Sequence, residues 1–579
     1  MTRPELGLRH LLVMYLRPHR RAVGLLGIVL VVSIGLQLAS PQVLQRFIDA
    51  AGKQPMDELL RLAVMFIALA IANQVFAVIA IYMGEQIGWR ATNAMREDLA
   101  LHCLRLDMPF HKTLTPGALA ERIDGDVKAL AEFFAFFVVR IVANAVLLVG
   151  ILVALGIENW RMSAVFGLFS LVAMFTLIRL QGAATSHWHA TRRHSADLYG
   201  LLDESFAGAE DLRGNGAHAY VMRRFFTHAR AFFRAKRTGR FIESVLWCTT
   251  TLLFAIAAVL ALALGGYLYF QGEMTIGSIV LVFFYAEMLR RPIEEITQRV
   301  EDLQRAAAGV QRIQELWRMQ SALGDGTRSL PADGPVEVAL EDVSFAYEAG
   351  EPVLHRVSLT VPPGRVLGVV GRTGSGKSTL ARLLVRLYDP AEGSIRLNGV
   401  ELREIRLAEQ RVRTALVSQD VRIIRGTVRE NITLFDDSVP AQRLAQVLED
   451  LGLGDWLRSL PDGLDTMLSP GGRGISAGEA QLLALARVFL TSPALVVLDE
   501  ASSRLDPALE AQVQRAIRRL MEGRTGVIIA HKLETLRWVD DILVLQDGRV
   551  VEHGSREQFM RNSDAIHARL LASDGGARS

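Results

Sequence analysis

Apolar residues are unevenly distributed along this chain, with six long runs before about residue 290 and only short runs after it. The fourth and sixth runs are shorter than the roughly 20 residues that cross the hydrocarbon core as a helix, and most of the others approach that length. Any single run is also compatible with a buried soluble helix, but six in series predict a membrane half. The runs are Ala22–Ala39, Leu62–Met83, Phe133–Ile157, Met162–Ile178, Val245–Tyr269 and Ile276–Leu289.

The connections between these runs alternate in length and in charge. Those after the first, third and fifth runs are short, whereas residues 84–132 and 179–243 form long connections that carry most of the Arg and Lys of this half. The positive-inside rule therefore places both long connections and both termini in the cytosol. Amphipathic stretches in the long connections predict helices that continue past the bilayer. Breaks at Pro116-Gly117 and at 214–216 predict short crosswise helices there.

A few polar residues lie inside the apolar runs, among them Arg140 and Glu287. Charges at such depth are costly and tend to face a bundle interior or a water-filled cavity, so these two are candidates for a substrate path. Two plainer explanations stay open. Arg140 would reach the cytosolic headgroups along its own stem, and Glu287 would pair with Arg290 or Arg291 one turn on.

Beyond Pro292 the pattern changes. Apolar residues at three- and four-residue spacing over 293–316 predict an amphipathic helix leading out of the membrane. The Gly- and Pro-containing stretch that follows lacks periodicity, and short strand patterns then begin at Val336. We therefore expect a transmembrane domain over 1–320, a linker over 321–335 and a soluble α/β domain over 336–579.

The soluble half is built around Gly371-Arg-Thr-Gly-Ser-Gly-Lys-Ser378, which matches the P-loop pattern G-x-x-x-x-G-K-S. An apolar strand pattern precedes it and a helix pattern beginning at Thr379 follows, which is the context the motif requires. Gly371, Gly374 and Gly376 let the backbone N–H groups face phosphate oxygens. Lys377 would reach the β- and γ-phosphates, and Ser378 would hold the bridging Mg²⁺. A plain Gly-rich turn before a helix is the weaker alternative.

A second strand pattern, 494–498, ends directly in Asp499-Glu500. An apolar run of this kind predicts a buried parallel strand that delivers a carboxylate to the sheet edge. In a P-loop ATPase, Asp499 would hold Mg²⁺ through water and Glu500 would act as general base on the attacking water. A final strand pattern, 526–530, delivers His531, a candidate γ-phosphate sensor, although a lone histidine is more often structural.

Composition agrees with a membrane protein of this kind. Apolar residues make up 50% of the 579 residues, and the net charge of only +3 gives no reason to expect a nucleic-acid partner. The two cysteines, Cys103 and Cys248, show neither metal-ligand spacing nor a disulfide framework. The first apolar run lacks a small-residue cleavage site, so we interpret it as a retained helix.

The order of these elements resembles an exporter-type ATP-binding cassette (ABC) transporter: an all-α six-helix transmembrane domain followed by an α/β P-loop ATPase domain, a half-transporter. The resemblance covers nearly the whole chain. It implies ATP-driven transport across the cytoplasmic (inner) membrane by alternating access, with Mg²⁺ as cofactor. It also implies that the chain works in a lipid bilayer, with a second half-transporter chain as its partner and a small-molecule, amphipathic or peptide substrate.

The resemblance assigns further residues to the ATP site. Tyr347 matches the aromatic residue that stacks on adenine, and Gln419 matches the glutamine that contacts Mg²⁺ and faces the membrane domain. Ile475-Ser-Ala-Gly-Glu479 matches the family signature, with Ser476 and Gly478 on the γ-phosphate of ATP held by the opposite subunit. Asp506 matches the acid of the D-loop, and His531 the switch histidine. The remaining residues of the loop, which are expected to cradle the nucleotide together with Thr379, are Arg372, Thr373 and Ser375.

Three departures from the family pattern suggest an asymmetric dimer. The signature has Ala477 and Glu479 where the family has Gly and Gln, and Arg504 replaces a small D-loop residue. The methyl group of Ala477 crowds a close backbone approach, and the carboxylate of Glu479 would repel a triphosphate if it pointed inward. We expect a heterodimer in which the partner supplies the better signature. The alternatives are a homodimer, an ATP-sensing membrane regulator that transports nothing, and an importer with the exporter fold, as in some siderophore-handling relatives.

Overall fold

The structure is a computed structural model that describes residues 13–128, 130, 141–298, 300–330, 334–348, 350–469, 475–499, 507–530 and 536–561. Five of the residues discussed above, Arg140, Glu500, Arg504, Asp506 and His531, lie outside these ranges. The chain forms two compact units. The first comprises residues 1–104 and 115–319, and the second comprises residues 105–114 and 320–579.

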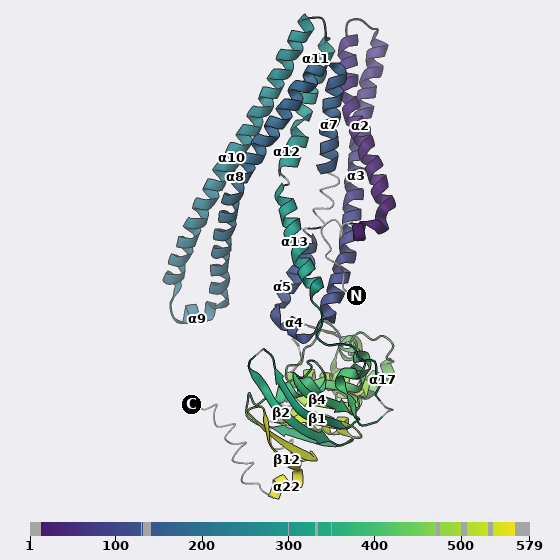
Figure 1. The fold of residues 1–579 in the computed structure, drawn as a ribbon, viewed down its shortest axis with the longest axis vertical. Helices are drawn as coiled ribbons and strands as arrows, with labels where there is room; N and C mark the ends of the chain where they lie inside the picture. Colours follow the sequence, from purple (N-terminus) through teal and green to yellow (C-terminus); the bar gives the residue numbers. More distant parts are fainter. Residues whose placement is uncertain are drawn as a thin grey trace. The chain divides into compact units, whose positions relative to one another are not determined.

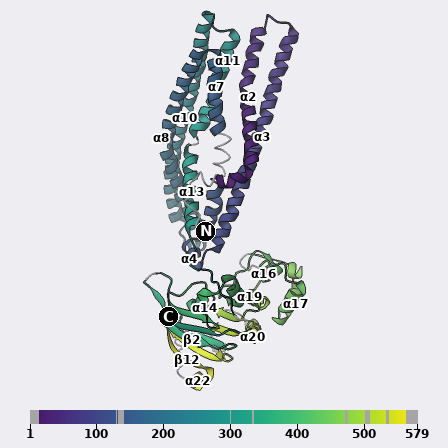
Figure 2. The same cartoon turned by 45° about the vertical axis from the view of Figure 1, so that its right-hand side comes forward.

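The first unit consists of helices, several of them very long (Figures 1 and 2). In the described part of the chain, four helices are long and apolar enough to cross a membrane, and Ala143–Glu158 is a shorter apolar helix. The sixth predicted span is the 13-residue helix α11. The helices are α2 (Arg20–Ala50), α3 (Met56–Arg105), α5 (Pro116–Ala120), α7 (Ala143–Glu158), α8 (Trp160–Ala207), α9 (Ala209–Gly214), α10 (His218–Phe270), α11 (Ile276–Met288), α12 (Arg290–Gln298) and α13 (Val300–Arg318).

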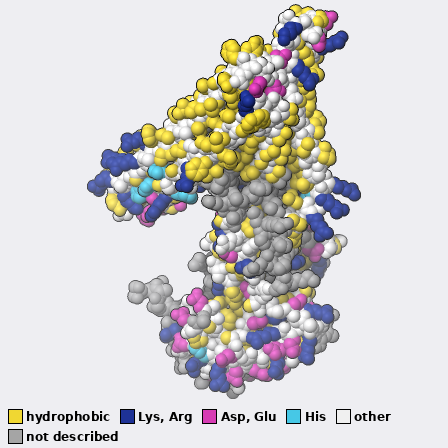
Figure 3. All heavy atoms as spheres, turned by 45° about the horizontal axis from the view of Figure 1, so that its top comes forward, with side chains coloured by type: hydrophobic (Ala, Val, Ile, Leu, Met, Phe, Trp, Pro, Cys, Tyr) yellow, Lys and Arg dark blue, Asp and Glu magenta, His cyan; other side chains and the backbone are white. Residues whose placement is uncertain are grey.

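The apolar runs account for only part of each long helix. In α8 and α10, which lie side by side in both ribbon views, the polar sequence beyond the apolar run stays helical as far as the short helix α9. Figure 3 shows Lys, Arg and His side chains gathered at one tip of this helical unit, separated from the main apolar surface. The short helix α9 ends at Gly214, where the sequence predicted a break.

The interior of the first unit is formed where α7, α8, α10, α11 and α12 meet. Its members include Ile151, Phe166, Phe254 and Tyr285, each at most 2% exposed. Many other large apolar side chains face outward, and Figure 3 shows them covering most of the visible helical surface. A contiguous exposed apolar surface of this extent marks an interaction with lipid or protein, and on helices of this length it fits a bilayer.

The second unit is organised by a six-stranded sheet of order β12-β11-β3-β10-β9-β6, in which all neighbours are parallel except β11 and β12. Successive residues of its central strands face opposite sides: Val366 and Val370 join one buried cluster, and Leu367 and Val369 join the other. Both faces are therefore covered, as parallel sheets require. The strands are β3 (Val366–Val370), β6 (Thr414–Val417), β9 (Leu495–Asp499), β10 (Thr525–Ile529), β11 (Asp541–Gln546) and β12 (Arg549–Ser555).

A second, antiparallel sheet has the order β2-β1-β4-β5. Its strands are β1 (Val338–Ala346), β2 (Pro352–Val361), β4 (Glu392–Leu397) and β5 (Val400–Glu401), and β7 (Gly426–Thr427) pairs separately with β8 (Met467–Leu468). The helices of the second unit are α4 (Met108–Thr113), α14 (Lys377–Leu384), α15 (Leu407–Arg413), α16 (Val428–Thr433), α17 (Ala441–Asp450), α18 (Gly454–Ser459), α19 (Ala477–Thr491), α20 (Pro507–Met521) and α22 (Arg556–Arg561).

The stretch expected to be a linker is bound to the second unit over its first half. We call residues 320–330 the strap. Arg328 pairs in parallel with Ile405: its N–H donates to the Glu404 carbonyl (2.8 Å), and its carbonyl accepts from the Arg406 N–H (3.0 Å). Gly326 is required here, because a Cβ would lie 2.1 Å from the Glu404 carbonyl oxygen.

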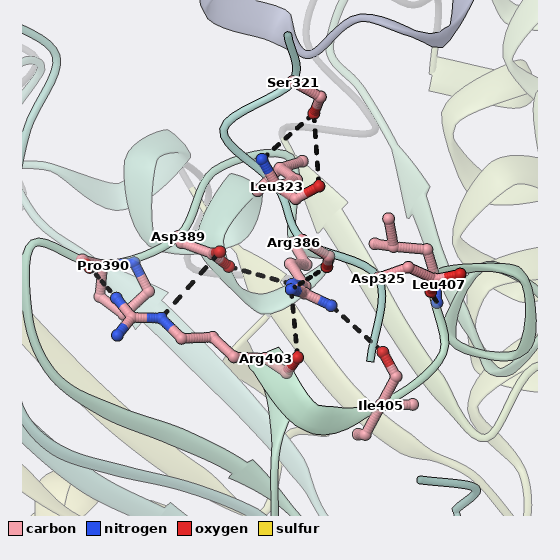
Figure 4. A network of polar contacts seen from close by, with 10 residues as sticks. Ser321, Leu323, Asp325, Arg386, Asp389, Pro390, Arg403, Ile405 and Leu407 are labelled. Carbon is pink, nitrogen blue, oxygen red and sulfur yellow. Dashed lines mark hydrogen bonds and ion pairs between the residues drawn. The ribbon is translucent and has the colours of Figure 1, made fainter. Parts of the chain in front are cut away.

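A buried arginine, Arg386, forms hydrogen bonds with the strap and with the segment that pairs with it (Figure 4). Its guanidinium donates to Asp389 (3.0 Å) and to the carbonyls of Gly324 (2.8 Å) and Ile405 (3.2 Å). Asp389 also lies 4.0 Å from Arg403. One fully buried cation thus joins the strap to the segment with which it pairs, so the first half of the stretch is an ordered part of the second unit.

Candidate nucleotide-binding site

The P-loop lies between β3 and α14, as its sequence predicts. All five residues of β3 are buried, and the strand delivers Gly371 to its carboxyl end. A Cβ on Gly371 would lie 2.1 Å from the Leu545 carbonyl oxygen. Gly376 caps α14 with a φ of +100°, and a Cβ there would lie 2.6 Å from the Leu354 side chain. Larger residues at either glycine would force the loop away from the sheet.

Two polar side chains of this loop, those of Ser375 and Lys377, are buried, whereas Arg372 and Thr373 are exposed. The ammonium of Lys377, a residue only 5% exposed, donates to the carbonyls of Gly371 (2.8 Å) and Arg372 (2.9 Å). The hydroxyl of Ser375 is buried and has no hydrogen-bond partner in the described part of the chain. The cost of leaving a buried hydroxyl unsatisfied makes this oxygen a candidate ligand contact. A buried cation, and beside it a hydroxyl without a partner among the described residues, at the N-terminus of a helix fit a phosphate group.

The carboxylate of Asp499 reaches the same edge of the sheet. It ends β9, which is separated from β3 only by β10, and both pairings are parallel. Gln419 lies two residues beyond β6, whose Val417 pairs with Leu498. The sheet therefore brings Gly371, Asp499 and Gln419 to one edge. The side chains of Asp499, Gln419 and Ser378, the last at the start of α14, all carry oxygen donors, the kind of ligand that Mg²⁺ prefers.

Tyr347 lies just beyond β1 and leans over α14. Its hydroxyl is 3.2 Å from the Thr379 hydroxyl and accepts a hydrogen bond from the Arg382 guanidinium (2.8 Å). Burial lowers the pKa of Arg382, but this hydrogen bond and the nearby charge of Asp499 raise it, and the balance is upward. Arg382 therefore stays cationic beside the loop.

Two residues near Tyr347 were not found from the sequence. The ring of Tyr388 meets that of Tyr347 nearly at a right angle, with centroids 5.2 Å apart. The ammonium of Lys112, in α4, lies 3.9 Å from the centroid of the Tyr347 ring. No local pattern links Lys112 to Tyr347, because 234 residues separate them in the sequence.

The signature residues begin a different helix, α19. Ser476 is its N-cap, and its hydroxyl accepts from the Glu479 N–H (3.2 Å). The Glu479 carboxylate accepts in return from the Ser476 N–H (2.6 Å), which completes a capping box. Gly478 is buried, whereas Ser476 and Ala477 are exposed. Glu479 therefore turns back onto the end of its own helix.

Of the remaining candidate residues, only Glu287 lies among the described residues. Glu500 and His531 directly follow β9 and Ala530, and Asp506 precedes α20, but all three lie outside the described residues, as does Arg140. Glu287 lies 3.9 Å from Arg290, which also pairs with Glu294 at 3.0 Å. The plainer explanation for Glu287, an ion pair one turn on, is thus the one that the structure supports.

A parallel sheet with a P-loop at its carboxyl edge, in a chain that also carries long apolar helices, defines a membrane-bound P-loop ATPase. Family models agree in both halves. Residues 23–293 match the ABC transporter transmembrane region, and residues 354–503 match the ABC transporter model. The chain belongs to the ABC transporters. It is a half-transporter with its membrane and ATPase domains fused, an ATPase whose activity is coupled to transport.

Similar proteins cover nearly the whole chain. An uncharacterized ABC transporter ATP-binding protein of Bacillus subtilis, YfiC, is 29% identical over 94% of this chain and 91% of its own length. A multidrug efflux ATP-binding/permease protein of Mycobacterium bovis is 32% identical over 86% of this chain but 42% of its own length. The structure of a bacterial Atm1-family ABC exporter with ATP bound superposes with a TM-score of 0.80 at 25% identity, covering 96% of this chain and 98% of that one.

These findings confirm the predicted class, fold and ATPase activity. ABC exporters work as dimers in a bilayer, so this chain is one half of an ATP-binding membrane transporter. The assignments of individual site residues and the identity of the second chain remain predictions.

Proposed function

We propose that this chain is one half of an exporter that moves a small amphipathic molecule outward across the cytoplasmic membrane, driven by ATP hydrolysis on the cytosolic side. The observation that carries the ATP-dependent part is the P-loop of the second unit, where Lys377 and the unsatisfied Ser375 hydroxyl face inward. Export is supported by the resemblance over the whole chain to an Atm1-family exporter and, over most of it, to a multidrug efflux protein.

In this proposal the chain's own groups divide the work of binding and hydrolysis. The loop amides and Lys377 hold the β- and γ-phosphates, and Tyr347 stacks on the base. Ser378, Gln419 and Asp499 would hold Mg²⁺, which would supply positive charge to the phosphate oxygens. Glu500 accepts a proton from the attacking water, and His531 senses the γ-phosphate.

The cytosolic orientation is supported by charge. The tip formed by α8, α9 and α10 carries the Arg- and Lys-rich sequence of the second long connection (Figure 3). Transfer of such a tip across a bilayer is disfavoured, which sets the side on which it stays.

We further propose that the natural assembly is a heterodimer. The N-terminus of α19 already holds the Glu479 carboxylate, and the Ser476 hydroxyl already accepts a bond from the same helix. A γ-phosphate arriving from the opposite subunit would meet like charge at this helix end. A partner with a neutral signature would serve this chain's P-loop better than a second copy would.

Reconstitution into liposomes tests both proposals. The chain is purified alone and together with the native chain that co-purifies with it, and ATPase activity and ATP-dependent movement of candidate amphipathic compounds are measured. We expect the pair to hydrolyse ATP and to accumulate substrate in vesicles whose ATPase domains face outward. Robust transport by the lone chain would refute the heterodimer. ATP hydrolysis that no compound stimulates or accompanies would favour an ATP-sensing regulator, and movement in the opposite direction would favour an importer.

A further inference from the structure

Helix α4 is joined to the strap at its start, and one of its side chains, Phe110, is buried. Asp107 caps the helix by accepting from the Phe110 N–H (3.3 Å), and it also accepts from the Ala322 N–H in the strap (2.6 Å). Phe110 is 8% exposed. The last turn of α4 then projects Lys112 toward the aromatic residues beside the P-loop.

Lys112 lies over one particular face of Tyr347. The other contacts of this ring are with Phe345 and Tyr388, two buried residues of the core whose rings meet it at interplanar angles of 87°. The hydroxyl is held by Thr379 and Arg382 of α14. The half-buried ring is therefore held by its hydroxyl and by two neighbouring rings, and the exposed Lys112 lies over one of its faces.

The ammonium of Lys112 occupies the volume that a stacked base would need. It lies 3.9 Å from the Tyr347 centroid and 5.4 Å from that of Tyr388. Stacked aromatic rings approach to similar distances, with centroids about 4.5–7 Å apart. A base on this face and the Lys112 ammonium cannot occupy it together.

We propose that Lys112 is a positioning residue that competes with the nucleotide base for the stacking face of Tyr347. The proposal rests on the proposed role of Tyr347 in base binding. Base binding displaces the ammonium and so removes one contact that seats α4. Coupling between two sites is reciprocal. The contact of Lys112 with Tyr347 therefore weakens base binding by a certain factor, and base binding weakens that contact by the same factor. The cation–π contact thereby links the first cytosolic connection to the state of the ATP site.

The test compares nucleotide with a ligand that has no base. Titration calorimetry on the full-length complex measures Kd for MgATP and for magnesium triphosphate in the wild type and in Lys112→Met, which keeps the apolar stem. Exposed cation–π contacts are modest, so we expect Lys112→Met to tighten MgATP binding relative to triphosphate by about two- to five-fold. Lys128 is another exposed lysine of the same connection, and Lys128→Met should leave the ratio of the two Kd values unchanged.

The same measurements in a Tyr347→Leu variant test the base-binding role of Tyr347 separately from the competition by Lys112. Tyr347→Leu should reduce the preference for MgATP over triphosphate and abolish the effect of Lys112→Met. Consider a result in which Tyr347→Leu acts as expected while Lys112→Met leaves the preference for MgATP over triphosphate unchanged or reduces it. That result would refute the competition by Lys112 and leave the base-binding role of Tyr347 intact. If Tyr347→Leu leaves the ratio unchanged, the base-binding role of Tyr347 fails, and the inference fails with it.

Discussion

Replacing Arg386 by Met should release the strap from the second unit while leaving the central sheet folded. Arg386 is 2% exposed, and its guanidinium donates to one carboxylate and to carbonyls on both sides of the strap pairing. Met has a similar apolar stem but no donor. The backbone at this position is left-handed, with φ of +50°, and its conformational cost is similar for Arg and Met. The difference between the two proteins therefore reports the loss of the guanidinium.

The size of the effect follows from what the substitution leaves behind. Removing one partner of a buried pair costs about 3–5 kcal/mol. The lower end applies here, because the Asp389 side chain is 22% exposed and keeps Arg403 at 4.0 Å. We therefore expect about 3 kcal/mol, which is roughly a hundredfold change in the opening equilibrium of the strap.

Hydrogen exchange followed by mass spectrometry on the full-length protein measures this opening directly. The reporting amides are those of Arg328, Leu330 and Arg406, which donate across the strap contact at 2.8–3.0 Å. They should exchange about a hundred times faster in Arg386→Met, whereas the amides of β3 should not change.

A matched arginine provides the control. Arg458 also pairs with two carboxylates, but its side chain is 63% exposed and one partner, Asp455, is 99% exposed. Arg458→Met should leave the strap amides at the wild-type rate, as expected for a surface pair. Strap amides that keep their wild-type exchange rate in Arg386→Met would refute the reasoning, and loss of protection in β3 as well would show that Arg386 supports the whole unit.

Three further predictions concern the ATP site. Lys377→Ala removes a cation from inside the loop and should weaken MgATP binding about ten- to a hundredfold, measured as Kd, with no loss of folded sheet. Glu500→Gln should bind MgATP normally but hydrolyse it about 10²–10⁴ times more slowly in a single-turnover assay, and a near-normal rate would exclude it as the general base. Glu479→Gln keeps the capping geometry but removes the charge, so it should raise the ATPase rate of a homodimeric preparation up to about fivefold; an unchanged rate would show that this carboxylate does not oppose the phosphate.

The features predicted well from the sequence are those encoded by consecutive residues. The P-loop glycines, Lys377 and the strand ending in Asp499 each carry their own local signal, and the structure has the expected strand, loop and helix in each place. The apolar runs predicted the membrane helices for the same reason. Amphipathic stretches in the long connections also predicted that helices continue beyond the apolar runs, and α8 and α10 are single helices of 48 and 53 residues.

What the sequence did not show depends on partners far apart in the chain. The stretch 321–335 was expected to be irregular because it contains Gly and Pro, and the backbone of the strap within it lies outside the regular strands. Irregular backbone can still pair, however, and here Gly326 is needed because the chain passes against Glu404. Arg386 and Lys112 each act on residues that only the fold brings near, so no spacing rule identifies them.

The signature segment carries two local signals in the same residues. Ser476 and Glu479 stand three residues apart before an apolar helix, which is the pattern of a capping box. The carboxylate of Glu479 was expected to repel a triphosphate if it pointed inward. In the structure the carboxylate accepts a hydrogen bond from the Ser476 N–H, a donor that would otherwise be free to bind a γ-phosphate at the start of α19. The two interpretations are compatible, because an anion already held at a helix N-terminus offsets the partial charge that attracts another. The P-loop of this chain is therefore equipped to hold a nucleotide, whereas its signature is partly satisfied by its own side chain. That difference within one chain is the physical reason to seek a second, different chain in the native complex.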